Sequence, residues 1–200
     1  MKKLLFIRHG EASHNIGYNK YGESAYLDII HTDSGLTEKG FLQAENAGKL
    51  LDTDFKKIYN SGDYCILVSP LKRCLLTSLI ALKNFKIPKD NFKVIENIRE
   101  FPCGLHTPNK RANKNSLMYF FGEKMNFDDL SSNNDILWMY DREETEDELN
   151  DRINDTKRYI NSLDCNNILI FTHSSYMNKF LFNNFDREIE HCKIYEYTLT

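Results

Sequence analysis

The sequence predicts an α/β fold in which helices cover a mostly parallel sheet. Short apolar runs typical of buried strands alternate along the chain with longer segments of helical periodicity, which is the pattern of crossover helices that connect parallel strands. Polar residues suited to chemistry follow three of these apolar runs. In open α/β sheets the carboxyl ends of the strands line one crevice, and ligands bind there.

The N-terminal part of the chain supplies the first strand and the first long helix. The apolar run at 4–8 predicts a strand, and the polar and aromatic stretch at about 11–34 predicts a long loop. A helix is expected next, because small or apolar residues recur on one helical face: Leu36, Gly40, Ala44, Ala47 and Leu51.

The middle of the chain begins with a second strand, predicted at 65–68. Ser69 suits the N-cap of the following helix and Pro70 suits its first position. One apolar face is expected on that helix: Leu71, Leu75, Ser78, Leu79 and Leu82. Residues 92–95 predict a third, shorter strand. The stretch 98–112 is expected to be irregular and to lie over the site, because it contains residues that break regular structure: Pro102, Gly104 and Pro108.

The C-terminal part continues the alternation. Residues 128–163 predict two helices, the second with an apolar face under many charges. A last central strand is expected at 167–171, a helix at 174–182 and a closing edge strand at 193–199. No repeat or low-complexity tract interrupts the sequence, and single cores grow to about 250–300 residues before chains split. We therefore expect a single domain over residues 1–200.

Composition and charge narrow the function. The 41% of hydrophobic and 28% of charged residues are close to the usual composition of folded soluble proteins. A formal net charge of −3 argues against binding of nucleic acid or of acidic membranes through overall charge, and no apolar run is long enough for a membrane span or a signal peptide. The five cysteines lack paired spacing and predict reduced thiols and a cytoplasmic location. Cys103 and His106 are spaced like half of a zinc site, but no second pair completes it, so neither a metal nor a cofactor is predicted.

Four side chains are expected to meet at one edge of the sheet. They follow three different predicted strands: Arg8, His9, Arg73 and His173. Two arginines and two histidines in an otherwise acidic protein predict a pocket for a small dianion, since planar guanidinium groups match phosphate oxygens. The helix expected from Ser174 would add backbone N–H donors at its N-terminus.

Five blocks of residues carry a resemblance that spans nearly the whole chain. The blocks are Arg8-His9-Gly10-Glu11 with Asn15, Leu36-Thr37 with Gly40, Gln43 and Ala44, Ser69-Pro70-Leu71 with Arg73 and Thr77, then Glu100, and finally His173. In this order they resemble the histidine phosphatase superfamily, which includes the phosphoglycerate mutases. A finer similarity, to a eukaryotic mutase-like phosphatase branch, rests on two stretches: Gly104-Leu105-His106-Thr107 with Lys110-Arg111, and Trp138 with Asp141-Arg142-Glu143. Ser174 departs from the pattern, because many members have glycine there.

The resemblance implies a three-layer α/β/α sandwich of the phosphoglycerate mutase-like type, without a metal. It also implies roles for two residues. Glu100 falls where the family places its proton donor, and His173 falls on its second active-site histidine.

The mechanism expected from these residues is transfer of a phosphoryl group to His9. A histidine attacks phosphorus only through an unprotonated nitrogen, and flanking cations disfavour its imidazolium form. A backbone carbonyl near Gly10 is expected to fix the tautomer. The phosphate clamp is expected to consist of Arg8, Asn15, Arg73 and His173. Glu100 would protonate the leaving alkoxide and then act as a base towards water.

The sequence thus predicts a metal-independent phosphomonoesterase that hydrolyses a small phosphorylated substrate through a phospho-His9 intermediate. Two alternatives remain. A phosphoglycerate-type phosphomutase would result if a second substrate hydroxyl replaced water, and a catalytically inactive phospho-ligand binding module would keep only the pocket. Three basic residues either recognise a second anionic group of the substrate or only solvate their loop: His106, Lys110 and Arg111.

Overall fold

The computed structural model describes residues 1–200, except for the side chain of Asp54. Its described part contains a five-stranded sheet with the order β3-β2-β4-β1-β5. The strands are β1 (Lys2–Arg8), β2 (Tyr64–Val68), β3 (Phe92–Val94), β4 (Asn167–Thr172) and β5 (Ile194–Leu199). All neighbours pair in parallel except the edge strand β5, which is antiparallel to β1. The predicted α/β class with a mostly parallel sheet is confirmed.

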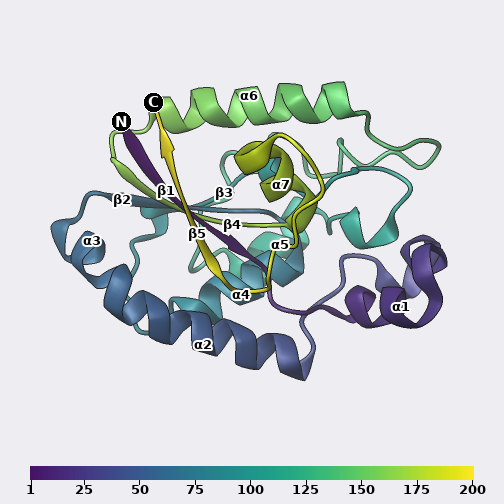
Figure 1. Ribbon diagram of the computed structural model, residues 1–200, viewed down its shortest axis with the longest axis horizontal. Coiled ribbons are helices and arrows are strands. Elements are labelled where there is room, and N and C mark those ends of the chain that lie inside the picture. Colours follow the sequence, from purple (N-terminus) through teal and green to yellow (C-terminus); the bar gives the residue numbers. More distant parts are fainter.

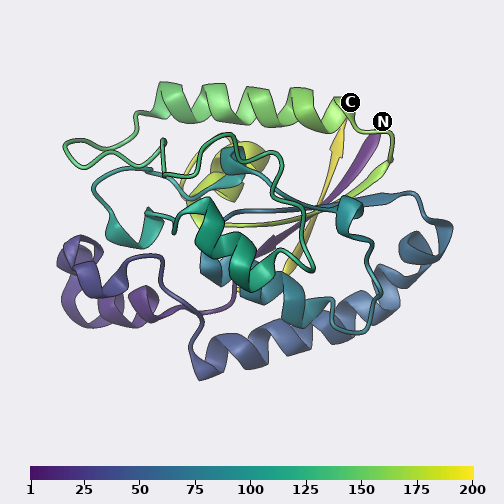
Figure 2. The same cartoon turned by 180° about the vertical axis from the view of Figure 1, so that it is seen from behind.

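Helices cover both faces of this sheet (Figure 1). One face packs against α2 (Glu38–Asp54) and α4 (Lys72–Ala81), and the other packs against α6 (Glu146–Ser162) and α7 (Ser174–Phe182). The shorter helices are α1 (Ser13–Tyr21), α3 (Lys56–Ser61) and α5 (Lys114–Phe121). Of these, α5 buries Leu117 in the core on the α2/α4 side. The view from behind shows α5 in front of the sheet (Figure 2). No helix among the described residues combines the length and the apolar character needed to cross a bilayer.

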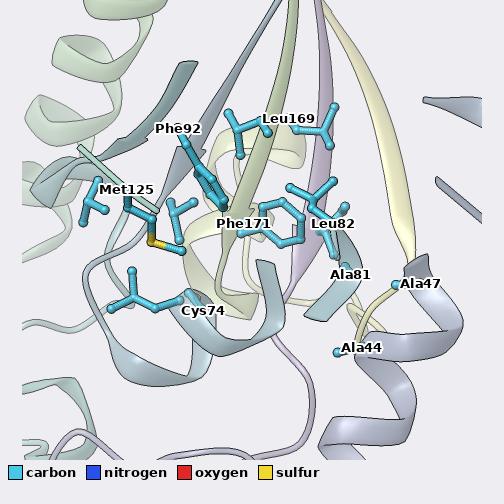
Figure 3. Close-up of a cluster of buried hydrophobic side chains, with 14 of the residues drawn as sticks. Ala44, Ala47, Cys74, Ala81, Leu82, Phe92, Met125, Leu169 and Phe171 are labelled. Atoms are coloured by element: carbon cyan, nitrogen blue, oxygen red, sulfur yellow. The ribbon is translucent and has the colours of Figure 1, made fainter. Parts of the chain in front are cut away.

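The alternation of side chains along β1 divides the core into two halves. Leu5 and Ile7 pack with residues of α2 and α4, whereas Leu4 and Phe6 pack with residues of α6 and α7. Successive residues of a strand point to opposite faces of a sheet, so one strand contributes to both cores. Figure 3 shows the α2/α4 side, where Phe171 of β4 lies among the buried side chains. Because β4 pairs in parallel with both β1 and β2, the carboxyl ends of these three strands lie at one edge of the sheet.

Two expectations at the N-terminal side of the site were wrong. The stretch 11–34 contains α1 and two short 3₁₀ segments rather than a loop. The sequence pattern does not predict helix α1, because this helix buries only His14 and Gly17 and has no apolar stripe. Helix α4 begins at Lys72, after the expected Ser69-Pro70 start. Its first free amide is capped from far along the chain, since Lys72 N donates to Asp33 Oδ1 at 2.8 Å.

The prediction of two helices between 128 and 163 was half wrong. Only α6 is present in that range of the described chain, and α5 lies upstream of it. Residues 132–135 are held in an irregular course by side chains: the guanidinium of Arg111 binds three successive carbonyl oxygens there, and Asp135 accepts from Arg99. Such long-range bonds leave no periodic signal in the sequence.

Candidate active site

His9 lies at the carboxyl end of β1, and its backbone N–H donates to Thr172 O of β4 at 3.0 Å. Its ring nitrogen Nδ1 is 2.7 Å from Gly10 O. A carbonyl oxygen only accepts, so Nδ1 carries the proton and Nε2 keeps its lone pair. Nε2 then accepts from Arg73 Nε at 3.2 Å. The structure contains the backbone hydrogen bond expected near Gly10, and that bond leaves Nε2 unprotonated.

Arg73 belongs to the first turn of α4 and is fully buried. Besides His9, it donates from Nη1 to Pro108 O at 2.6 Å and from Nη2 to Asn109 Oδ1 at 2.9 Å. The segment Thr107–Asn109 is a 3₁₀ turn within the stretch expected to lie over the site. This segment therefore holds the guanidinium plane against the His9 ring.

His173 follows β4 and is the N-cap residue of α7. Its ring centroid lies 5.2 Å from that of His9. Its Nε2 is hydrogen-bonded to Ser69 Oγ at 2.7 Å, so Ser69 contacts the site, whereas Leu71 occupies the N-cap position of α4. The strand ends of β1, β2 and β4 thus bring His9, Ser69 and His173 together.

Burial and neighbouring cations keep the two ring systems neutral. Burial lowers the pKa of the His9 imidazole well below its usual range, and nearby positive charges, that of Arg73 foremost, lower it further. The pKa of His173 is lowered well below its usual range in the same way, by burial first and then by the charge of Arg73. A neutral imidazole with an unprotonated nitrogen is the form required of a nucleophile.

Arg8 is the last residue of β1, and its Nη1 donates to Ile189 O at 2.6 Å. Its Nε is buried and has no hydrogen-bond partner among the described residues. Asn15 is engaged within α1, because its Oδ1 accepts from Ala12 N at 2.9 Å and its Nδ2 lies 3.2 Å from His14 Nε2. Arg8 therefore presents an unused donor, whereas Asn15 is held against a neighbouring histidine.

Glu100 is anchored at the N-terminus of α7. Its Oε1 accepts from Ser175 N at 3.0 Å and from Tyr176 N at 3.3 Å, while no hydrogen bond from the described residues reaches Oε2. Burial lowers the pKa of Arg8 and of Arg73, and the negative charge of Glu100 offsets part of that effect at both. Glu100 thus lies within electrostatic range of both arginines, with one carboxylate oxygen left free.

The three basic residues of the loop occupy different places. The ring of His106 lies 4.9 Å from that of Tyr26, and its Nε2 is 3.1 Å from Glu143 Oε1. The Lys110 ammonium lies 4.3 Å from the centre of the Trp138 ring. Arg111 does not join the histidines: its side chain is buried, and all five N–H donors bind Glu96 and backbone carbonyls. The structure therefore gives Arg111 the task of holding the loop.

Two histidines beside His9 were missed from the sequence. The His14 ring centroid lies 5.9 Å and that of His191 5.4 Å from the His9 centroid. His14 could have been suspected, since it precedes Asn15 in the first sequence block. His191 lies in the irregular segment before β5, where periodicity carries no information. No group of three or more His, Cys, Asp or Glu side chains in the described part of the chain is arranged to hold a metal ion.

A family model described as "Histidine phosphatase superfamily (branch 1)" matches residues 4–198. The chain belongs to this superfamily. The resemblance noted in the five sequence blocks is thereby confirmed. No curated protein matches the chain.

Solved structures of this kind share the fold. Phosphoserine phosphatase from Entamoeba histolytica, solved as a variant in complex with phosphoserine, is 17% identical with a TM-score of 0.58, covering 99% of this chain and 91% of that one. The alpha-ribazole phosphatase from Shigella flexneri is 22% identical with a TM-score of 0.57, covering 90% and 78%. Phosphoglycerate mutase from Thermus thermophilus is 18% identical with a TM-score of 0.54, covering 97% and 91%. The histidine phosphatase fold of this chain is therefore phosphoglycerate mutase-like.

Proposed function

We propose that this histidine phosphatase superfamily member is a metal-independent phosphomonoesterase that hydrolyses a small phosphorylated substrate through a phospho-His9 intermediate. The observation that carries the proposal is the state of the His9 ring. Its Nδ1 proton is committed to Gly10 O, its Nε2 lone pair faces Arg73, and it lies in a buried cluster rich in cations. That combination suits attack on an anionic phosphoryl group.

In the first step His9 Nε2 forms a bond to phosphorus while the bond from phosphorus to the leaving oxygen breaks. Nε2 and Arg73 Nε are hydrogen-bonded at 3.2 Å, so the phosphoryl group enters by replacing that bond, and Arg73 then donates to a phosphoryl oxygen instead. The unpaired Nε of Arg8 is a second donor for those oxygens. Fixed donors stabilise the charge spread over the equatorial oxygens.

Glu100 is the proposed proton carrier. The Oε1 anchor at α7 fixes the carboxyl group, and Oε2 delivers a proton to the leaving alkoxide. In the second step Oε2 takes a proton from water, the water oxygen bonds to phosphorus and the N–P bond breaks. The electron pair of that bond returns to His9 Nε2, which regenerates the starting state.

Asn15, His173 and the basic loop residues complete the proposal. His173 and Asn15 are assigned to help Arg8 and Arg73 bind the phosphoryl group. Recognition of the rest of a small substrate is assigned to His106 and Lys110, whose side chains lie against the rings of Tyr26 and Trp138. The five cysteines are all free thiols, which supports a reducing, cytoplasmic location.

The test combines turnover with trapping of the intermediate. The wild-type protein and His9→Ala are assayed for phosphate release on sugar phosphates, nucleotides, phosphoinositols and phosphopeptides, and ³²P-labelled substrate is quenched within milliseconds. We expect an acid-labile label on His9 that His9→Ala loses together with turnover, while the control His31→Gln keeps both. Normal turnover by His9→Ala would refute the nucleophile. Isomerisation of 3-phosphoglycerate with its bisphosphate primer, in place of phosphate release, would show a mutase.

A further inference from the structure

Residues 189–192, between α7 and β5, are hydrogen-bonded to Arg8 and His9 at the end of β1. Ile189 O accepts from Arg8 Nη1 at 2.6 Å, and Cys192 N donates to Arg8 O at 2.9 Å. His191 Nδ1 lies 2.6 Å from His9 O. These bonds lie beyond the paired residues of β1 and β5, which end at Ile7 and Ile194. The segment 189–192 therefore contacts the site through bonds of its own.

The backbone of this segment is held in a strained form. Cys192 has a φ of 60°, in the left-handed region that is unfavourable for residues with a side chain. Such conformations persist where the surrounding structure determines them, and they gather at functional sites. At Cys192 the left-handed turn directs its N–H to Arg8 O, next to the residue whose ring reaches His9 O.

The protonation of His191 is fixed by its partner. A carbonyl oxygen only accepts, so His191 Nδ1 carries the proton that it donates to His9 O. Burial lowers the pKa of His191 to about 4, and the charge of Arg8 contributes. The ring is thus a neutral donor at neutral pH, and it adds no positive charge beside the nucleophile.

We propose that His191 is a positioning residue for phosphoryl transfer, which holds the His9 carbonyl so that the Arg8 and His9 side chains stay aligned on one phosphoryl group. The proposal rests on the function proposed above. His9 O is two bonds from the His9 Cα, so a shift of this carbonyl rotates the ring that attacks. Displacements of about 1 Å at a reacting centre reduce rates about 100-fold.

Three variants separate positioning from packing. His191→Phe keeps a ring but removes the donor. His191→Asn keeps an N–H donor the same number of bonds from Cα as Nδ1, so it should rescue. The control Lys193→Met removes the ion pair of Lys193 with Glu190, which lies next to the same segment and involves neither Arg8 nor His9.

The readouts are the single-turnover rate of phospho-His9 formation, KM, the thermal midpoint and the affinity for orthovanadate, which mimics a phosphoryl group in transfer. We expect His191→Phe to slow phospho-His9 formation about 10- to 100-fold and to lower the affinity for orthovanadate by a similar factor. KM and the thermal midpoint should change little. His191→Asn should recover most of both losses, and Lys193→Met should match the wild type.

Two results would overturn the positioning role: wild-type rates and vanadate affinity in His191→Phe, or equal losses in His191→Phe and His191→Asn together with a lower thermal midpoint. The proposed function fails in a different way, through the absence of phospho-His9 in the wild-type protein. In that case the vanadate affinities of the same variants still decide whether His191 aligns the anion site.

Discussion

The buried histidines make the stability of this protein sensitive to mild acid. Three imidazoles at the site are almost fully buried, and burial lowers the pKa of each well below its usual range: His9, His14 and His173. In the unfolded chain they titrate near the ordinary value of about 6.5. Below that pH the unfolded state binds protons that the folded state does not, so the free energy of unfolding falls as the pH falls.

The size of the effect follows from this linkage. Each imidazole that stays neutral in the folded state lowers the free energy of unfolding by about 1.2 kcal/mol between about pH 7 and about pH 5.5. Three such imidazoles lower it by about 4 kcal/mol. His191, whose pKa burial lowers to about 4, adds a further loss over this range. Burial raises the pKa of Asp33, which acts in the opposite direction and offsets part of the loss. The sum is a large share of a total stability of about 5–15 kcal/mol.

The assay is urea unfolding at these two pH values, followed by circular dichroism. We expect the free energy of unfolding to drop by about 3–4 kcal/mol from about pH 7 to about pH 5.5, and His14→Gln to reduce that drop by about a third. The control Ile66→Val removes a methyl group but no titrating group, so it should leave the drop unchanged. Equal stability at both pH values in the wild-type protein would refute the view that these rings are held neutral.

Three further predictions concern single residues of the site. Glu100→Gln should slow hydrolysis of glycerol 2-phosphate about 100-fold but of 4-nitrophenyl phosphate less than about 10-fold, because the aryl leaving group needs less protonation; equal losses on the two substrates would count against a proton carrier. Gly10→Ala should lower the free energy of unfolding by about 1–3 kcal/mol or more, since its Cβ would lie 2.5 Å from a backbone oxygen. The control Gly35→Ala has its nearest neighbour at 3.9 Å, and matching urea midpoints for the two variants would contradict the close approach. Asn109→Ala should reduce kcat/KM about tenfold, because a buried Arg73 donor loses its partner. An unchanged kcat/KM would show that the hydrogen bond to Pro108 O is enough to hold the guanidinium.

Sequence reasoning succeeded where a rule of topology applies. Parallel strands place their carboxyl ends at one edge, so His9 and His173 could be brought together from positions far apart in the sequence. The tautomer of His9 could also be anticipated, because a neutral imidazole that keeps one lone pair free needs an acceptor for its other nitrogen. Both inferences use chemistry and order along the chain and need no detailed packing.

Other parts of the site depend on contacts that no local pattern encodes. His191 reaches the site through a left-handed residue in an irregular segment. Arg73 is oriented by Pro108 O and by Asn109, and the former is a backbone group that every residue possesses. Arg111 was counted among candidate substrate contacts because its charge is visible in the sequence, whereas the carbonyl oxygens that occupy it are not.

The same arrangement of charge makes the site reactive and costly to fold. Arg8 and Arg73 lie within range of each other's charge, and no carboxylate among the described residues forms an ion pair with either. Cations buried without an ion pair are unfavourable. Protonation of the imidazoles around them would add further positive charge, so the folded state keeps these rings neutral. A phosphoryl dianion supplies the missing negative charge, and neutrality leaves His9 the lone pair that attacks it. Burial first, and then the charges of Arg73 and Arg8, keep the imidazoles neutral and make the fold sensitive to acid. The same buried positive charges favour a phosphoryl dianion, so the acid sensitivity of the fold and the affinity of the site for its substrate are linked.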